Sequence, residues 1–317
     1  MALDWRRFEM GFGKGFGKTI LFGDHFVVYG LLGIPCALSC VTTAKVERSK
    51  NSGFELVDNR PATPDYKLAK KGEYDSLISR VIEFMGVKEG LKITLGGDLF
   101  AASGVGASAA CAAAIARAIN EEFKMGWNDE KINEAAFEGE TAGSGTPSGI
   151  DNTAAVFGGL LLFRKNTAGG KNFIEVMRIK APVEIVLGNT GKTSLTKEVV
   201  GDVKKLKDSS PEKINSLFDE YAKLVEEARI ALQNYDLKKV GSLMTKNHSL
   251  LQKLTVSCNE LDELVEASLK AGAFGAKLTG TGRGGLMIAL TPGKELQQKV
   301  FDAIKAKGFE ATKAMIG

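Results

Sequence analysis

Up to about residue 180, the pattern of hydrophobic and polar positions alternates between the two-residue repeat of strands and the longer repeat of helices. Short apolar or β-branched runs bounded by turn residues predict strands, and apolar residues three and four positions apart predict helices. The predicted strands are residues 19–22, 26–29, 35–46, 91–95 and 158–163. The predicted helices are residues 74–85, an alanine-rich run at 111–117 and a helix that begins at 129. Residues 51–70 are polar, and we expect a loop-rich segment there.

Long amphipathic helices dominate the second half of the chain. They are predicted at residues 195–207, 211–234, 237–254, 259–271 and 293–307, with strands at 183–187, 276–278 and 286–290. Because strands and helices mix without a regular alternation, the predicted fold class is α+β. We place a domain boundary near residue 180, which gives an N-terminal domain at 1–180 and a C-terminal domain at 181–317.

The composition is that of an ordinary globular protein and argues against several classes of function. Of the 317 residues, 44% are hydrophobic and 25% are charged, and no apolar run approaches the length of a membrane span. The net charge of +4 is spread along the sequence and is too small to indicate nucleic-acid binding. The N-terminus lacks the apolar segment of a secretion signal. We therefore expect a soluble cytoplasmic protein that binds neither nucleic acid nor a membrane.

The four cysteines indicate no metal site. Cys36, Cys40, Cys111 and Cys258 lie in apolar or helical contexts and lack the spacing of metal ligands. We expect reduced, buried thiols, as is usual in a cytosolic protein.

A stretch of small residues at 96–117 is the strongest candidate for binding chemistry. It begins as a glycine-rich loop and continues directly into an alanine-rich run with high helix propensity. Free N–H groups at a helix start bind anions, and glycines let a backbone approach a ligand closely. The stretch therefore indicates a polyphosphate site, with Ser108 in the first turn or at the cap of the helix. The alternative is a tight loop before a helix that packs through its alanines.

Other motif patterns in the chain are incomplete. Residues 11–19 resemble a phosphate-binding P-loop, but its first glycine would fall at Phe12, and a strand pattern follows. Gly104 and Gly280 each begin a spacing typical of dinucleotide binding. The second precedes a strand, however, and the first lacks a suitably placed acidic residue. The chain has only two histidines, so it offers few candidates for the base of a hydrolase triad and few ligands for a zinc or haem site.

Three glycine-rich segments belong together by their order and spacing. They are residues 15–25, 103–110 and 277–285. Their arrangement resembles the three motifs of the GHMP kinase superfamily, and the resemblance covers nearly the whole chain. Finer details are similar to the mevalonate kinases within that superfamily, in residues 21–30 (LFGDHFVVYG), 145–153 (GTPSGIDNT) and 243–251 (LMTKNHSLL).

The resemblance implies both a fold and an activity. The fold is a two-lobe α+β structure, with an N-terminal lobe like ribosomal protein S5 domain 2, a C-terminal ferredoxin-like lobe and the active site in the cleft between them. The activity is transfer of the γ-phosphate of ATP, with Mg²⁺, to the 5-hydroxyl of mevalonate. The resemblance leaves open whether the protein forms a homodimer and whether isoprenoid diphosphates inhibit it.

The same resemblance assigns residues to the ATP, the metal ion and the chemical step. Ser108 and Glu140 match the positions that coordinate Mg²⁺, a hard cation that prefers oxygen ligands. Asp151 matches the catalytic carboxylate that takes or orients the proton of the acceptor hydroxyl. Lys18 matches the lysine that keeps this carboxylate ionised and stabilises charge on the transferred phosphoryl group. The residues that would wrap the phosphates are Ser103, Gly104, Val105, Gly106, Ala107, Ser108 and Ala109.

For the acceptor substrate, the resemblance implies a second set of residues. These are His25, Thr196, Gly280, Thr281 and Arg283. Arg283 departs from the family pattern, which has a glycine at this place. Because a guanidinium group suits phosphate oxygens, we hypothesise that Arg283 contacts a phosphate. The alternative is a solvent-facing arginine at a turn.

Without the resemblance, each of these residues has a simpler interpretation. Asp151 would be a turn or cap residue, Thr196 and Ser108 would be helix caps, and Lys18 and Glu140 would be surface charges. Competing functions are another GHMP kinase acting on phosphomevalonate or homoserine, diphosphomevalonate decarboxylase, and a non-catalytic binding protein. Extra basic residues in the acceptor pocket would favour a phosphorylated substrate, whereas residues 145–153 and 243–251 disfavour the decarboxylase.

Overall fold

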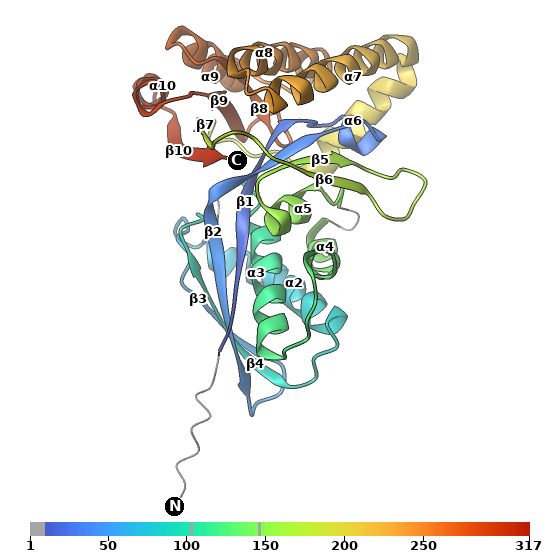
Figure 1. The fold of residues 1–317 in the computed structure, drawn as a ribbon, viewed down its shortest axis with the longest axis vertical. Coiled ribbons are helices and arrows are strands. Elements are labelled where there is room, and N and C mark those ends of the chain that lie inside the picture. The colour runs from blue at the N-terminus through green and yellow to red at the C-terminus, as the bar shows by residue number, and fades with distance from the viewer. Residues whose placement is uncertain (1–9, 102–103, 145–146) are drawn as a thin grey trace, which may run out of the picture. The chain divides into compact units, whose positions relative to one another are not determined.

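The computed structural model describes residues 10–101, 104–144 and 147–317, which form two compact units (Figure 1). Unit 1 contains the described residues up to Gly17 and those of Cys40–Phe157, and unit 2 contains Lys18–Ser39 and Gly158–Gly317. Strands β1 (Gly11–Phe22) and β2 (Ile34–Ser49) each contribute residues to both units. These bounds differ from a single division near residue 180, which stays a prediction.

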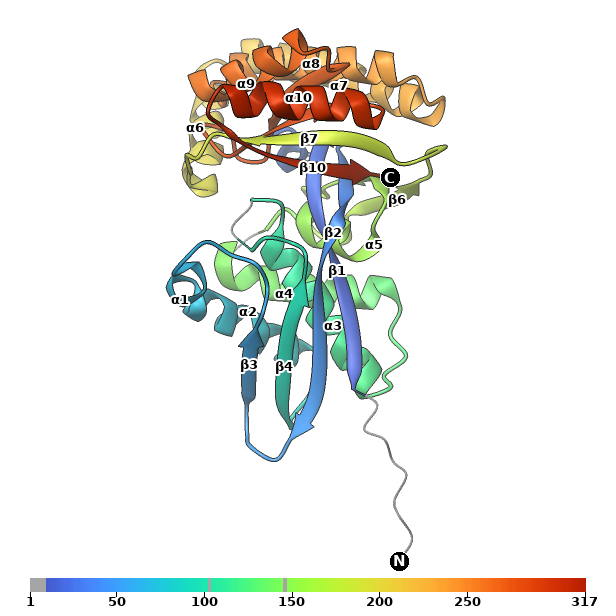
Figure 2. The ribbon, with the colours of Figure 1, turned by 90° about the vertical axis from the view of Figure 1, so that its left-hand side faces the viewer.

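Unit 1 is a four-stranded sheet with helices on one face. Strand β4 pairs in parallel with β3 and antiparallel with β2, and β1 pairs with β2 at the other edge (Figure 2). The further strands are β3 (Phe54–Asp58) and β4 (Gly90–Gly97). The helices are α1 (Tyr66–Ala69), α2 (Lys71–Phe84), α3 (Ala107–Glu122), α4 (Asp129–Ser144) and α5 (Ile150–Phe157). Helix α3 packs against α2, α4 and α5, and its alanines are buried.

A glycine repeat lets strand β1 lie directly on helix α3. Every second residue from Gly11 to Gly15 is a glycine. A Cβ added at Gly13 would lie 2.1 Å from the carbonyl oxygen of Ala114. Gly11 and Gly15 face the neighbouring turns of the helix at the same distance. The segment that resembles an incomplete P-loop in the sequence is therefore a strand whose glycines serve packing.

Side chains of α3 also bind the backbone of β1 at its free edge. Arg117 donates to the carbonyl oxygen of Lys14 (2.9 Å), and Glu121 accepts from the N–H of Phe12 (2.7 Å). These bonds satisfy polar backbone groups that an edge strand leaves open. They also fix the register of the strand against the helix.

Unit 2 is built on the antiparallel sheet β10–β7–β9–β8, with helices on one face (Figures 1 and 2). Its strands are β7 (Val183–Asn189), β8 (Gly275–Thr279), β9 (Leu286–Leu290) and β10 (Glu310–Ile316). The helices are α6 (Thr196–Ser209), α7 (Pro211–Gln233), α8 (Leu237–Lys253), α9 (Asn259–Lys270) and α10 (Lys294–Ala306). A hairpin of β5 (Leu160–Arg164) and β6 (Phe173–Met177) pairs with β2 at Cys36.

One prediction about a single element is wrong, and several elements were missed. Residues 26–29 do not form a strand, because Phe26 is buried in a stack with Tyr221 and the 3₁₀-helix η1 (Val27–Tyr29) follows it. Residues 51–70 are loop-rich as expected, but they also contain β3 and α1, which were not predicted. Strands β6 and β10 and helix α5 were not predicted. The longer helices and the remaining strands are confirmed, although β1 begins at Gly11 and the predicted strand covers only its end at 19–22.

Two expectations from the composition can be compared with the structure. Cys36 and Cys111 are buried as expected, but Cys40 and Cys258 are only partly buried; all four are free thiols. Among the described residues, no helix is long and apolar enough to cross a membrane.

The glycine contact predicts a large effect of one added methyl group. We expect Gly13→Ala to lower the free energy of unfolding by roughly 1–3 kcal/mol or more, because helix backbone occupies the space. Urea unfolding measures the change. Gly72→Ala is the matched control, since the described residues leave open space around a Cβ there. Equal midpoints for the two variants would contradict the close contact.

Candidate active site

The start of helix α3 has the geometry of an anion site. Gly104 and Gly106 have φ angles of +72° and +74°, which glycine adopts at little cost. The first intrahelical bond runs from Ala110 N–H to the Gly106 carbonyl (2.9 Å). Helix geometry therefore leaves the N–H groups of residues 107–109 without intrahelical acceptors, where a phosphate binds favourably. Ser103, predicted to belong to this loop, lies outside the described residues.

Three packed helices carry the other predicted ATP and metal residues of unit 1. Ser108 lies in the first turn of α3, Glu140 on α4 and Asp151 in the first turn of α5, and each residue is partly buried. The three helices pack against one another. A carboxylate in a first turn is favoured by the helix dipole. In the described part of the chain, no group of three or more His, Cys, Asp or Glu residues could hold a metal ion.

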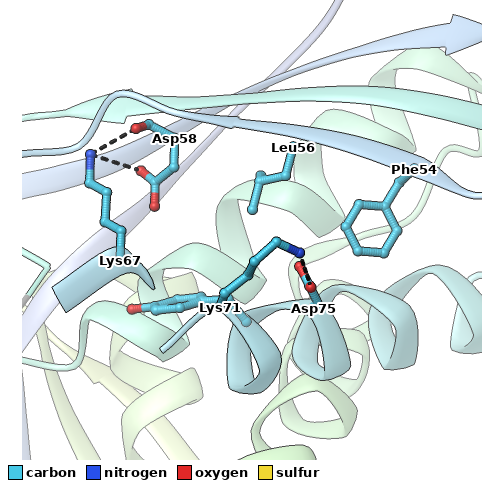
Figure 3. Close-up of a pocket in the computed structure, with 7 residues that line it drawn as sticks. Phe54, Leu56, Asp58, Lys67, Lys71 and Asp75 are labelled. Carbon is cyan, nitrogen blue, oxygen red and sulfur yellow. Dashed lines mark hydrogen bonds and ion pairs between the residues drawn. The ribbon is translucent and has the colours of Figure 1, made fainter. Parts of the chain in front are cut away.

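A different part of unit 1 contains a hollow of about 490 Å³ (Figure 3). It is bordered by β3, α1 and α2 and contains none of the predicted site residues. Its charged side chains pair with each other: Lys71 with Asp75 (2.5 Å) and Lys67 with Asp58 (3.8 Å). We therefore place the phosphate site at the start of α3 and not in this hollow.

In unit 2, the predicted acceptor residues His25, Thr281 and Thr196 are linked by hydrogen bonds. The Nε2 of His25 lies 2.7 Å from the carbonyl oxygen of Thr281, and the hydroxyls of Thr281 and Thr196 lie 2.7 Å apart. Thr196 is the first residue of α6, and its side chain bonds Thr281 instead of capping the helix. The structure thus brings these three residues together.

Burial of the His25 ring disfavours its charged form. Burial lowers its pKa below the usual value of 6.5. Because a carbonyl oxygen can only accept, Nε2 carries the proton that binds Thr281, and Nδ1 keeps its lone pair. Among the described residues, this buried Nδ1 has no hydrogen-bond partner. The ring therefore presents an acceptor atom for a ligand.

Lys18 also belongs to unit 2 and lies on β1, only 7% exposed. A lysine is seldom buried to this extent unless a charge or a ligand compensates. Its burial argues against the interpretation as a surface charge. Its partner in catalysis stays a prediction.

Arg283 has protein partners. It has a φ of +51°, and its guanidinium donates to Asp202 of α6 (2.7 Å) and to the carbonyl oxygen of Thr255 (3.1 Å). The side chain is about a third exposed. These contacts tie the loop after β8 to α6, and the predicted phosphate contact stays a prediction.

Sequence reasoning missed two charged residues at this site, Asp24 and Lys277. Both side chains are fully buried and form an ion pair of 2.5 Å. The signal was present, because Lys277 interrupts the apolar strand pattern of β8 and Asp24 directly precedes His25.

The second histidine of the chain has structural contacts. The buried His248 donates from Nε2 to Asp262 (3.0 Å) and accepts at Nδ1 from the N–H of Leu278 (3.3 Å). It thereby joins α8, α9 and β8. Burial lowers the pKa of this imidazole too.

Comparisons with known proteins agree with this arrangement. Two family models match, GHMP kinases N terminal domain at residues 76–159 and GHMP kinases C terminal at residues 216–310. The mevalonate kinases of Thermococcus sibiricus and Pyrococcus abyssi are 35% and 33% identical, each over 92% of this chain and 91% of the relative. A crystal structure of L. major mevalonate kinase in complex with R-mevalonate has a TM-score of 0.92 and 37% identity, covering 100% of this chain and 98% of that chain.

The chain belongs to the GHMP kinase family, and it is a kinase with the mixed α+β fold of that family. Within the family, the three relatives described above are all mevalonate kinases. The superfamily and fold class implied by the sequence motifs are confirmed.

The buried histidines predict how stability depends on pH. Their pKa values are lowered in the folded state, so the unfolded chain binds more protons below its pKa of about 6.5. The free energy of unfolding is therefore greatest above pH 6.5 and falls as the pH decreases toward the folded-state pKa values. We expect a slope of at most about 1.4 kcal/mol per pH unit for each histidine.

Urea unfolding between pH 7.5 and 5.5 measures this slope. His248→Gln removes the contribution of one histidine to the pH dependence of stability. The free energy of unfolding of this variant should therefore change less with pH than that of the unaltered chain. Equal stability of the unaltered chain at both ends of this pH range would contradict the prediction.

Arg283→Gly tests the phosphate hypothesis, because glycine accepts the backbone angle while the side chain and its guanidinium are removed. We expect the KM of ATP or of the acceptor to rise roughly tenfold, as for loss of one charge-assisted hydrogen bond. Steady-state kinetics with each substrate varied measures both constants. Asp202→Asn is the control that breaks the ion pair and keeps the guanidinium. If neither KM changes in Arg283→Gly, the residue contacts no phosphate.

Proposed function

We propose that this kinase transfers the γ-phosphate of ATP to the 5-hydroxyl of mevalonate, giving 5-phosphomevalonate and ADP. The observation that carries the proposal is the similarity, over the whole chain, to the L. major enzyme solved with R-mevalonate. The sequence similarity to curated mevalonate kinases over 92% of the chain supports the same activity.

In this proposal, the start of α3 binds the phosphates of ATP. The N–H groups of residues 107–109 and the helix dipole offer positive potential to the phosphate oxygens. The half-buried hydroxyl of Ser108 and the carboxylate of Glu140 are hard oxygen donors, which fit Mg²⁺ together with water and phosphate oxygens. The metal ion would neutralise charge on the phosphates during transfer.

The remaining groups act on the acceptor and on the transferred phosphoryl group. Asp151 accepts the proton of the 5-hydroxyl, and Lys18 stabilises the charge that develops on the phosphoryl oxygens. His25 offers its Nδ1 lone pair to a donor group of the acceptor, and Thr281 and Thr196 lie beside it. Phosphoryl transfer depends mostly on positioning and charge stabilisation, so this set suffices.

A homodimer and a cytoplasmic location stay predictions. The alternative acceptors are phosphomevalonate, diphosphomevalonate and homoserine. The buried Nδ1 of His25, which has no hydrogen-bond partner among the described residues, supports a hydrogen-bond donor on the acceptor over a phosphate at that position.

The direct test measures ADP release with Mg-ATP and each of these four acceptors separately. We expect turnover with mevalonate alone. Asp151→Ala should lower kcat by roughly 10²–10⁴-fold, the usual contribution of a general base. Glu130→Gln is the matched control, because it removes an exposed carboxylate from the first turn of α4.

Each other outcome has a distinct meaning. Turnover with another acceptor would preserve the kinase assignment and reject mevalonate. Full activity of Asp151→Ala would reject this residue as the base. If no ADP is released with any of the four acceptors, the proposed function is rejected.

A further inference from the structure

We propose that the buried ion pair of Asp24 and Lys277 is a positioning device for the acceptor site: it fixes the Gly280 N–H and, through the adjoining residue, the ring of His25. This inference rests on the proposed function, because it concerns how the same site holds its acceptor substrate. Neither residue is among the groups to which the sequence or the chemistry above gives a role.

All donor capacity of Lys277 is used inside unit 2. Its ammonium group donates to Asp24 Oδ2 (2.5 Å), to the carbonyl oxygen of Leu278 (2.5 Å) and to the carbonyl oxygen of Ile20 (3.2 Å). An ammonium group has three protons, so the three bonds satisfy it. Both side chains of the pair are 0% exposed. The pair therefore joins the end of β1 to β8 without access to solvent.

The second oxygen of Asp24 reaches the loop that follows β8. Its Oδ1 accepts from the N–H of Gly280 at 2.5 Å. The next residue along each segment makes a second bond, from His25 to the carbonyl oxygen of Thr281 at 2.7 Å. Two consecutive residues are thus bonded to two consecutive loop residues, and this arrangement fixes both the distance and the rotation of the segments.

His25 needs such support, because its backbone is strained. Its φ of +62° lies in the left-handed region, which costs a residue other than glycine about 1–3 kcal/mol. The bonds made by Asp24 on one side and by the His25 ring on the other hold the residue in this conformation. The result is a buried Nδ1 that has no hydrogen-bond partner among the described residues.

Stability alone does not explain a buried ion pair. The cost of removing two charges from water offsets most of their attraction, and apolar replacements are often as stable or more so. An apolar pair could fill the same volume, but it could not accept the Gly280 N–H. The chemical property that only this pair supplies is the fixed geometry of the loop and of His25.

The first experiment uses three variants of the full chain: Asp24→Asn, Lys277→Met and the double variant. We expect each single variant to raise the KM of mevalonate or lower kcat by at least about tenfold, because small displacements in a site cost this much or more. The KM of ATP should change by less than about twofold, since the start of α3 is untouched. The double variant should be no worse than the singles, because both act through one pair.

A control variant separates positioning from general destabilisation. Asp262→Ala removes the acceptor of the His248 bond elsewhere in unit 2 and should lower stability without raising the KM of mevalonate. Unfolding midpoints of all variants are measured alongside. A single variant leaves one unpaired charge buried and can fail to fold for that reason. The double variant carries no unpaired charge at this place, so its kinetics then test the proposal.

A second measurement reports the geometry without any activity. The chain has only two histidines, so the ring ¹⁵N signals of His25 are assigned by comparison with His248→Gln. We expect the unaltered protein to show the Nε2–H tautomer alone, and Lys277→Met and the double variant to show a mixture of the two tautomers.

Wild-type kinetics and an unchanged single tautomer in the folded variants would overturn the inference. If the unaltered protein phosphorylates no acceptor, the proposed function fails. In that case the tautomer of His25 still decides whether the ion pair positions the ring.

Discussion

The close contact between strand β1 and helix α3 is the constraint on which unit 1 depends. The glycines at every second position of β1 leave no room for a side chain, so the strand backbone touches the helix backbone turn by turn. Alanines elsewhere on α3 are also buried, and α2, α4 and α5 pack against this helix. The position of Ser108 and of the free N–H groups at the start of α3 follows from this packing.

In unit 2, polar groups hold the functional residues in place. Its acceptor residues lie on a loop after β8, on the segment after β1 and at the start of α6, and hydrogen bonds and ion pairs connect all three. Loops cannot be placed by a repeating apolar contact, because they have no regular face to bury. Directional bonds from Asp24, His25 and Arg283 provide the placement, and Lys277 neutralises the buried carboxylate.

The sequence predicted the elements that carry a clear periodic signal and missed those that depend on distant contacts. The long helices α7 and α8 were found because their apolar positions repeat regularly. Residues 26–29 have strand-forming side chains, yet the stack of Phe26 on Tyr221 from α7 determines their conformation. Strand β10 has an exposed, partly charged face, and the residues next to it in the sequence do not indicate that it pairs with β7.

The site could be predicted mainly by resemblance, since single residues in isolation favoured simpler roles. Lys18 reads as a surface charge in the sequence, and only the structure shows it buried. Asp24 and Lys277 were missed because charged residues are normally assigned to the surface. Their pairing joins residues far apart along the chain, and no local sequence pattern indicates such a contact.

The contact of β1 with α3 has a thermodynamic consequence for ligand binding. Glycine and alanine have no side-chain rotamers, so the packed faces lose no side-chain conformational entropy when the chain folds. These side chains also lose no conformational entropy when a phosphate binds. These glycine and alanine side chains therefore add nothing to the entropic cost of binding a phosphate at the start of the helix.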